Sequence, residues 1–290
     1  MKKFLIVTAD DFGLHDAVNE AVDKASAAGV LTAASLMVGA PATADAVRRA
    51  RELPELRVGL HLVLADGWAV LPRRLIPSLV DADGRFGNRM FVDGVRYFML
   101  PGVRSQLEAE IRAQFSAFAR TGLPLDHVNA HKHFHLHPTL LDMIVRIGRE
   151  FGMHAIRVPH EPLWFSARSA VMAGTANAAL LAPWLAMMKG RLRAQGIGYN
   201  DRVFGIACSG SLDEATLLEI LARLPPGVSE IYLHPATRSQ TAITSSMAKY
   251  RHADELDALL SARVLDAVAA TNAVRGGYRD AIPTRARPAM

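Results

Sequence analysis

The chain has 290 residues, of which half are hydrophobic and 21% are charged, and these proportions exclude a disordered polypeptide. Its formal net charge of +5 comes from scattered arginines rather than from a basic block with interleaved aromatic residues, so no nucleic-acid partner is expected. The single cysteine excludes an internal disulfide framework, and the first apolar run ends too early, at Asp10, for a signal peptide, which together favour a cytoplasmic location.

Short apolar runs alternate with helical patterns along the whole chain, as in βα units around a parallel sheet. Strands are expected at residues 4–9, 31–38, 57–63, 126–131, 154–158, 203–208 and 229–234. Helices are expected at residues 15–28, 42–53, 104–121, 138–151, 168–194, 213–223 and 253–269. Seven strands are fewer than a complete barrel needs, so the predicted fold class is α/β, a distorted or incomplete (β/α) TIM-like barrel.

The domain organisation follows from the absence of any linker or repeat. One barrel domain is expected over residues 1–274, and residues 275–290, which carry several arginines and prolines, are expected to form a poorly ordered tail. Residues 66–101 are the least regular part of the chain, and a long insertion after a strand is often a lid or a binding loop.

Polar residues follow the expected strands at the point where each strand ends. Because the carboxyl ends of parallel barrel strands share one rim, residues far apart in sequence are expected to converge there. These residues are Asp10, Asp11, His61, His131, Arg157 and His234.

Two of these positions have alternative explanations when each is considered alone. The adjacent carboxylates of Asp10 and Asp11 repel each other unless a cation or a proton is shared, but one of them could simply cap the following helix. His61 lies in an otherwise apolar run, where a lone histidine is more often a satisfied core residue than a ligand.

The densest polar signal is the stretch 127–137, which contains five of the eleven histidines. With the alternation of a strand, Asn129, His131, His133 and His135 would point to one side, toward a metal or a polar substrate. The alternative is a solvated histidine tract. Two imidazoles and one carboxylate would leave open positions on a divalent metal ion, which suits zinc without excluding magnesium.

Four short motifs lie at the ends of expected strands: Ala-Asp-Asp-Phe-Gly at 9–13, Gly-Leu-His at 59–61, His-x-His-x-His at 131–135 and His-Pro at 234–235. In these motifs the chain resembles the YdjC-like carbohydrate deacetylases. The resemblance covers most of the chain, and it implies hydrolysis of the N-acetyl group of an acetylated amino sugar. It places the metal on Asp11, His61 and His131.

The same resemblance implies roles for the residues around the metal. Asp10 becomes the catalytic base and His234 the acid. From its place at the end of an expected strand, Arg157 would orient Asp10, bind substrate or form a structural ion pair. Asn129, His133 and His135 are the candidates for substrate binding. The family usually has Asp-Ser where this chain has Asn129-Ala130, and this departure bears on substrate specificity.

A narrower resemblance concerns residues 239–256, which are similar to the hopanoid-biosynthesis-associated branch of the family. That branch implies an N-acetylglucosaminyl lipid as substrate, and the family resemblance implies a homodimer. The apolar stretch 171–188 is then either a buried barrel helix or a surface that rests on the inner face of a membrane through Trp184 and the nearby basic residues Lys189, Arg191 and Arg193. Two rival functions remain: a metal-dependent phosphoesterase and a catalytically silent sugar-binding module.

Overall fold

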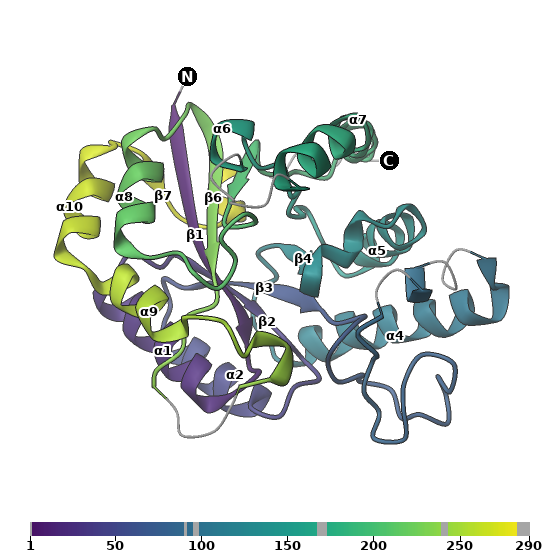
Figure 1. Cartoon of the computed structure of the whole chain (residues 1–290). Helices are drawn as coiled ribbons and strands as arrows, with labels where there is room; N and C mark the ends of the chain where they lie inside the picture. Colours follow the sequence, from purple (N-terminus) through teal and green to yellow (C-terminus); the bar gives the residue numbers. More distant parts are fainter. Residues whose placement is uncertain (1, 90–91, 95–98, 167–172, 239–242, 283–290) are drawn as a thin grey trace, which may run out of the picture.

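The computed structural model describes residues 2–89, 92–94, 99–166, 173–238 and 243–282, with side chains outside 173–180. A parallel sheet with the strand order β4-β3-β2-β1-β6-β5 forms the centre, and helices cover its outside (Figure 1). The predicted α/β fold class with a distorted barrel is confirmed. The strands are β1 (Lys3–Phe12), β2 (Ala33–Leu36), β3 (Arg57–Leu62), β4 (Val128–Ala130), β5 (Arg202–Phe204), β6 (Gly227–Leu233) and β7 (Val274–Arg275).

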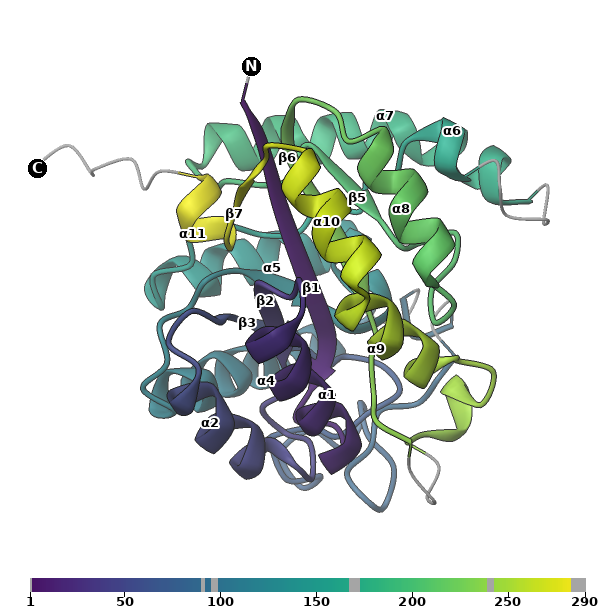
Figure 2. The same cartoon turned by 90° about the vertical axis from the view of Figure 1, so that its left-hand side faces the viewer.

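The long strand β1 is the centre of this sheet (Figure 2). It pairs with β6 along residues 3–9 on one edge, while β2 and the short β7 share the other edge. Eight of its ten residues are buried, which explains its nearly continuous apolar sequence, since a parallel strand covered on both faces shows no polar alternation.

The strand expected at 154–158 is not a regular strand. On one side the N–H of Arg157 donates to the carbonyl of Val128 in β4 at 2.9 Å, and on the other the N–H of Ile156 donates to Gly198 at 3.0 Å. Only isolated bridges form, because Pro159 and Pro162 supply no N–H to extend a ladder. This irregular segment spans the gap between β4 and β5 and accounts for the distortion of the barrel.

The helices largely follow the predicted pattern. They are α1 (Asp16–Ala28), α2 (Thr43–Glu52), α4 (Pro101–Arg120), α5 (Pro138–Glu150), α6 (Leu163–Ser166), α7 (Ala173–Ala194), α8 (Glu214–Ala222), α9 (His252–Leu260), α10 (Ala262–Ala270) and α11 (Tyr278–Ala281). The single helix expected at 253–269 is instead two helices. Ser261 has extended backbone, with φ −61° and ψ 129°, and its side chain caps α10 by accepting from the N–H of Val264.

The prediction of a poorly ordered tail is wrong for residues 275–282. Strand β7 pairs with β1, and α11 follows it directly. Tyr278 is fully buried, and its hydroxyl donates to Glu230 at 2.6 Å. The tail prediction failed because one buried aromatic residue fixes a segment whose composition is otherwise that of a loop. Residues 283–290 lie outside the described residues.

The insertion after β3 is fastened to the barrel by α4. The buried carboxylate of Glu110 accepts from the N–H groups of Val70 and Leu71 at 2.8 and 2.9 Å. Gln114, one turn later, accepts from the N–H of Val63 and donates to its carbonyl. These contacts hold the chain at Val63 and again at Val70 and Leu71, where the insertion leaves the barrel. They also explain why one face of α4 carries buried polar residues.

The described part of α7 does not present Trp184 as an exposed membrane anchor. The indole N–H of Trp184 donates to the carbonyl of Leu136 at 2.9 Å, and Leu185 is only 5% exposed. Leu181 and Met187 are the large hydrophobic residues that this helix exposes among those described. No helix in the described ranges combines the length and the apolar character that crossing a bilayer requires.

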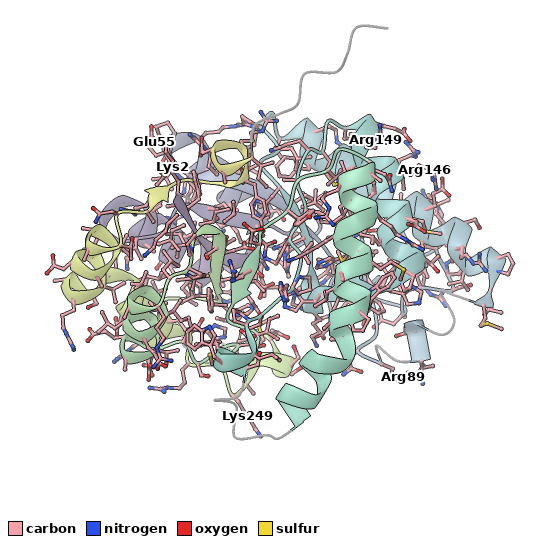
Figure 3. All side chains as sticks on the ribbon, turned by 90° about the horizontal axis from the view of Figure 1, so that it is seen from above. Lys2, Glu55, Arg89, Arg146, Arg149 and Lys249 are labelled. Carbon is pink, nitrogen blue, oxygen red and sulfur yellow. The ribbon has the colours of Figure 1, made fainter. Side chains whose placement is uncertain are left out.

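Basic side chains are spread over the surface. Figure 3 shows Arg89, Lys249 and the neighbouring Arg146 and Arg149 at separate points of the perimeter. Several of the arginines are also paired locally, as Arg146 is with Glu108 at 2.9 Å.

Candidate metal centre

Asp10 and Asp11 enter the site together because β1 ends irregularly. In a regular strand neighbouring side chains point to opposite faces. Here the register with β2 shifts between Ala9 and Phe12, and Asp11 has a φ of 65°, in the left-handed region. Both carboxylates are therefore buried at the same rim, with exposed fractions of 3% and 1%.

Two histidines from neighbouring strands meet Asp11. His61 is near the end of β3, and His131 follows β4 directly. Asp11 Oδ1 lies 3.2 Å from His61 Nε2 and 3.1 Å from His131 Nδ1, and the two nitrogens are 3.3 Å apart. All three side chains are buried, and they form the one group in the described part of the chain whose donor atoms could hold a metal ion.

The chemistry of these three residues fits a divalent cation. Neither carboxylate oxygen of Asp11 accepts a hydrogen bond of regular geometry, although a buried charge without a partner is costly. Burial opposes its ionisation, but His131 and His61 outweigh burial and hold the pKa of Asp11 well below its usual value. One carboxylate and two imidazoles that converge within contact distance are a typical ligand set for zinc and similar metals.

Asp10 is bound by a buried arginine. Arg157 donates to Asp10 through Nη1 at 2.5 Å and Nη2 at 3.0 Å, and it has no exposed surface. Its remaining donors reach Glu230 at 2.9 and 2.8 Å. Burial acts to raise the pKa of Asp10, but the charge of Arg157 outweighs it, so the pKa lies well below the usual value. Arg157 therefore holds Asp10 ionised and in a fixed orientation.

Glu230 and Tyr278 complete this network, and the sequence reasoning missed both. Glu230 is fully buried, and it also accepts from Thr8 Oγ1 at 2.7 Å and from the hydroxyl of Tyr278. Tyr232 packs its ring against the guanidinium of Arg157, 4.6 Å from the ring centroid. The available signal was an acidic residue in the middle of the apolar run of β6.

His234 follows β6 and is held through its backbone by α9. Its N–H donates to Glu255 at 2.6 Å, and its carbonyl lies 2.5 Å from Nδ1 of His252. Burial lowers the pKa of the His234 imidazole, while Asp11 and Asp10 oppose this shift. Its own Nδ1 has no hydrogen-bond partner, so the ring can accept or donate a proton at that atom.

The histidines after His131 do not continue β4 as a strand. They belong to the short 3₁₀ segment η1 (His131–Leu136), in which Lys132 and His133 have positive φ of 55° and 54°. His133 Nε2 lies 3.1 Å from the hydroxyl of Tyr232, and the fully buried His135 bonds through Nε2 to the carbonyl of Arg157. The expected alternation of these side chains to one face is therefore wrong.

Asn129 is the last of the expected substrate-binding residues, and it lies inside the protein. It has no exposed surface. Its Oδ1 lies 2.7 Å from His61 Nδ1, and its Nδ2 donates to Asp10 at 3.1 Å and to Ser35 at 2.9 Å. It links the metal ligand His61 to the neighbouring carboxylate.

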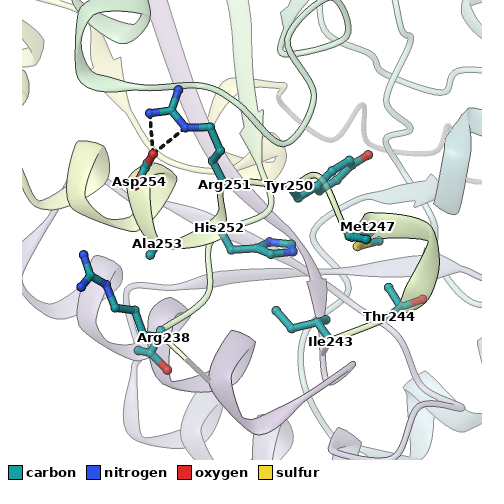
Figure 4. Close-up of a pocket in the computed structure, with 11 residues that line it drawn as sticks. Arg238, Ile243, Thr244, Met247, Tyr250, Arg251, His252, Ala253 and Asp254 are labelled. Atoms are coloured by element: carbon teal, nitrogen blue, oxygen red, sulfur yellow. Dashed lines mark hydrogen bonds and ion pairs between the residues drawn. The ribbon is translucent and has the colours of Figure 1, made fainter. Parts of the chain in front are cut away.

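A cavity of about 410 Å³ lies beside His234 (Figure 4). Tyr250 lies between the cavity and His234, because its ring lines the cavity and its ring centroid is 5.1 Å from that of His234. The described lining combines apolar residues with two arginines: Thr237, Arg238, Ile243, Thr244, Met247, Ala248, Tyr250, Arg251, His252, Ala253 and Asp254. Arg251 is paired with Asp254, as the dashed lines in Figure 4 show.

The sequence model for the family described as YdjC-like protein matches residues 4–270 of the chain. The chain belongs to the YdjC-like family. This YdjC-like protein is 32% identical over 270 residues to a carbohydrate deacetylase of Brevibacillus brevis, an alignment that covers 90% of this chain and 92% of that protein. It is also 29% identical over 281 residues to a chitooligosaccharide deacetylase of Klebsiella pneumoniae, covering 97% and 100% of the two chains.

A crystal structure from Enterococcus faecalis V583, of a protein to which cellobiose-phosphate cleavage has been ascribed, has the same fold. The TM-score is 0.73 at 23% identity, and the match covers 97% of this chain and 99% of that one. At 23% identity this similarity establishes that the two proteins share a fold.

Proposed function

We propose that this YdjC-like protein is a metal-dependent hydrolase that removes the N-acetyl group from an N-acetylglucosaminyl substrate. The observation that carries the proposal is the buried group of Asp11, His61 and His131, with Asp10 adjacent in the chain. The deacetylase names of the two relatives support the same reaction class.

Each residue of the site has a role in this reaction. A divalent cation held by Asp11, His61 and His131 would polarise the acetamide carbonyl and lower the pKa of a bound water. Asp10, ionised and oriented by Arg157, takes a proton from the attacking water. His234 delivers a proton to the amide nitrogen as its bond to the acetyl carbon breaks, so that acetate and a free amine leave.

We further propose that the sugar is linked to a lipid. Nine of the residues that line the cavity beside His234 lie between Ile243 and Asp254, in the segment that resembles the hopanoid-associated branch, while residues 239–242 lie outside the described residues. The walls formed by Ile243 and Met247 are apolar, as a lipid aglycone next to the sugar requires. The homodimer, the cytoplasmic location and contact with a membrane surface stay predictions from the sequence.

Metal-stripped protein, reloaded separately with zinc or magnesium, tests the function. We expect acetate release from an N-acetylglucosaminyl substrate after reloading, and no phosphate release from phosphate esters. Phosphate release without acetate release would instead identify the phosphoesterase. Sugar binding with no turnover under either metal would identify a silent binding module.

The cavity assignment leads to a prediction about Ala248, an exposed residue of its lining. Ala248→Trp should fill part of the cavity and raise KM for a lipid-linked substrate roughly 10-fold, the cost of about 1.4 kcal/mol of binding. Metal affinity and the KM for a short acetamido sugar should stay unchanged. Steady-state kinetics on both substrates measure this.

Lys249→Trp is the matched control, because Lys249 is exposed and adjacent in sequence but is not part of the lining. It should leave both KM values unchanged. Equal KM values for wild type and Ala248→Trp on the lipid-linked substrate would show that the cavity does not bind the aglycone.

A further inference from the structure

A line of buried polar side chains leads from the metal centre to the opposite end of the barrel. It runs from His61 through Asn129, Ser35 and His127 to Asp126, and each of the five is at most 2% exposed. Successive contacts are 2.7, 2.9, 3.0 and 2.9 Å long. None of the last three residues touches the proposed metal ligands, so the proposed reaction gives them no role.

The hydrogen bonds in this line can be followed from its far end. The carboxylate of Asp126 accepts from the backbone N–H groups of Tyr278 and Arg279, both at 2.9 Å. Burial opposes ionisation of Asp126, but His127 and these N–H groups together lower its pKa below the usual value. An ionised carboxylate only accepts, so His127 Nδ1 must donate to it.

The remaining bonds follow in order. When His127 carries its single proton on Nδ1, its Nε2 is an acceptor, and the hydroxyl of Ser35 donates to it. Ser35 Oγ then accepts from Asn129 Nδ2, which leaves Asn129 Oδ1 to accept from His61 Nδ1. In the neutral His61 that a metal ion requires, Nε2 is then the nitrogen without a proton, and it faces Asp11 at 3.2 Å.

The line is rigidly packed around His127. The ring of Tyr278 stacks on it with centroids 4.9 Å apart and planes 26° apart. On β3 it faces Gly59, where an added Cβ would come within 2.5 Å of the imidazole. Only glycine allows this approach, so the position of the ring is set from both sides.

We propose that Asp126, His127 and Ser35 are positioning residues for the metal centre, which orient the Asn129 amide and thereby preset the metal-binding tautomer of His61. The proposal rests on the metal site of the proposed function. Asp10 also accepts from Asn129 Nδ2 and therefore favours the same orientation of the Asn129 amide. Ser35 is a second acceptor for this Nδ2.

Ser35→Ala tests the proposal, because it removes one hydroxyl from the middle of the line. In metal-free protein labelled with ¹⁵N-histidine, the ring nitrogen shifts report which nitrogen of His61 carries the proton. At alkaline pH, where the imidazole is neutral, we expect a single Nδ1–H tautomer of His61 in the wild type and a mixture in Ser35→Ala. Zinc affinity, measured by chelator competition, should fall roughly 10- to 100-fold, as is typical when the hydrogen-bond partner behind a metal ligand is lost.

Ser229→Ala is the matched control. Ser229 is also a fully buried strand serine, but its hydroxyl has no hydrogen-bond partner. This variant should leave both the tautomer and the zinc affinity unchanged. If Ser35→Ala fails to fold, His127→Phe provides the second variant, since it keeps a flat ring between Gly59 and Tyr278 but removes both nitrogens.

A wild-type tautomer and wild-type zinc affinity in Ser35→Ala, or in His127→Phe where that variant is needed, would overturn the proposal. The tautomer and the zinc affinity also distinguish a failure of this proposal from a failure of the proposed function. If the wild type bound no zinc, the metal-dependent function would fail, while the tautomer measured in metal-free protein would still decide the role of the line.

Discussion

Asp11→Asn should abolish zinc binding, whereas Asp10→Asn should retain the metal and lose turnover by roughly 10²- to 10⁴-fold, the loss expected for a general base. The two residues are adjacent and both are buried, but their surroundings differ. Asp11 faces His61 and His131 and accepts no regular hydrogen bond, while Asp10 is already neutralised by Arg157. An amide at 11 removes the only carboxylate of the ligand set.

Calorimetric zinc titration of both variants, together with acetate release, measures this difference. Each variant is the control for the other, because both make the same substitution at neighbouring buried positions. If Asp10→Asn lost the metal and Asp11→Asn kept it, the roles of the two carboxylates would be reversed. His61→Ala and His131→Ala should also abolish zinc binding, because each removes one of three ligands.

Arg157→Met should lower the free energy of unfolding by about 3–5 kcal/mol, which is the usual cost of leaving buried charges without their partner. Arg157 has no exposed surface and forms four hydrogen bonds that bind Asp10 and Glu230 together. Methionine fills a similar volume, so the loss would come from the two uncompensated carboxylates. Urea denaturation of the metal-free proteins gives the values.

Arg112→Met is the control for this prediction. Arg112 also forms a bidentate ion pair, with Glu150, but the two side chains are 40% and 49% exposed. Its loss should lower the free energy of unfolding far less than the loss of Arg157 does, because water screens the pair. A similarly small loss for Arg157→Met would mean that the buried carboxylates take up protons or rearrange without penalty.

Much of the site could be predicted from the sequence because parallel topology alone brings strand ends to one rim. That argument places His61, His131 and Arg157 near the first strand without any knowledge of their contacts. It could not place Asp10 and Asp11 on the same side, because this depends on a bulge and on one left-handed residue. Neither feature has a sequence signature at this position.

The failures elsewhere have a common physical cause. The alternation of His131, His133 and His135 imitates a strand, but the backbone turns after Ala130. Glu230 and Tyr278 each appear unremarkable alone, and their importance arises from a hydrogen bond between residues that are distant in sequence. Local patterns report secondary structure, whereas the pairing of buried polar groups is decided by the tertiary fold.

The burial of Tyr278 has a consequence for the order in which the chain is made. Asp10 and Arg157 emerge from the ribosome before Glu230, and Tyr278 emerges last of the four. Until then Glu230 lacks one donor, and Asp126 lacks the two backbone N–H groups that fix its carboxylate. We therefore expect the end of the barrel that holds Asp126 to stay accessible to water until these donors are in place. We expect water to be excluded from the buried polar groups only when residues 275–282 have been synthesised. A chain that ends before residue 275 should become compact but leave Asp126 and Glu230 accessible to water.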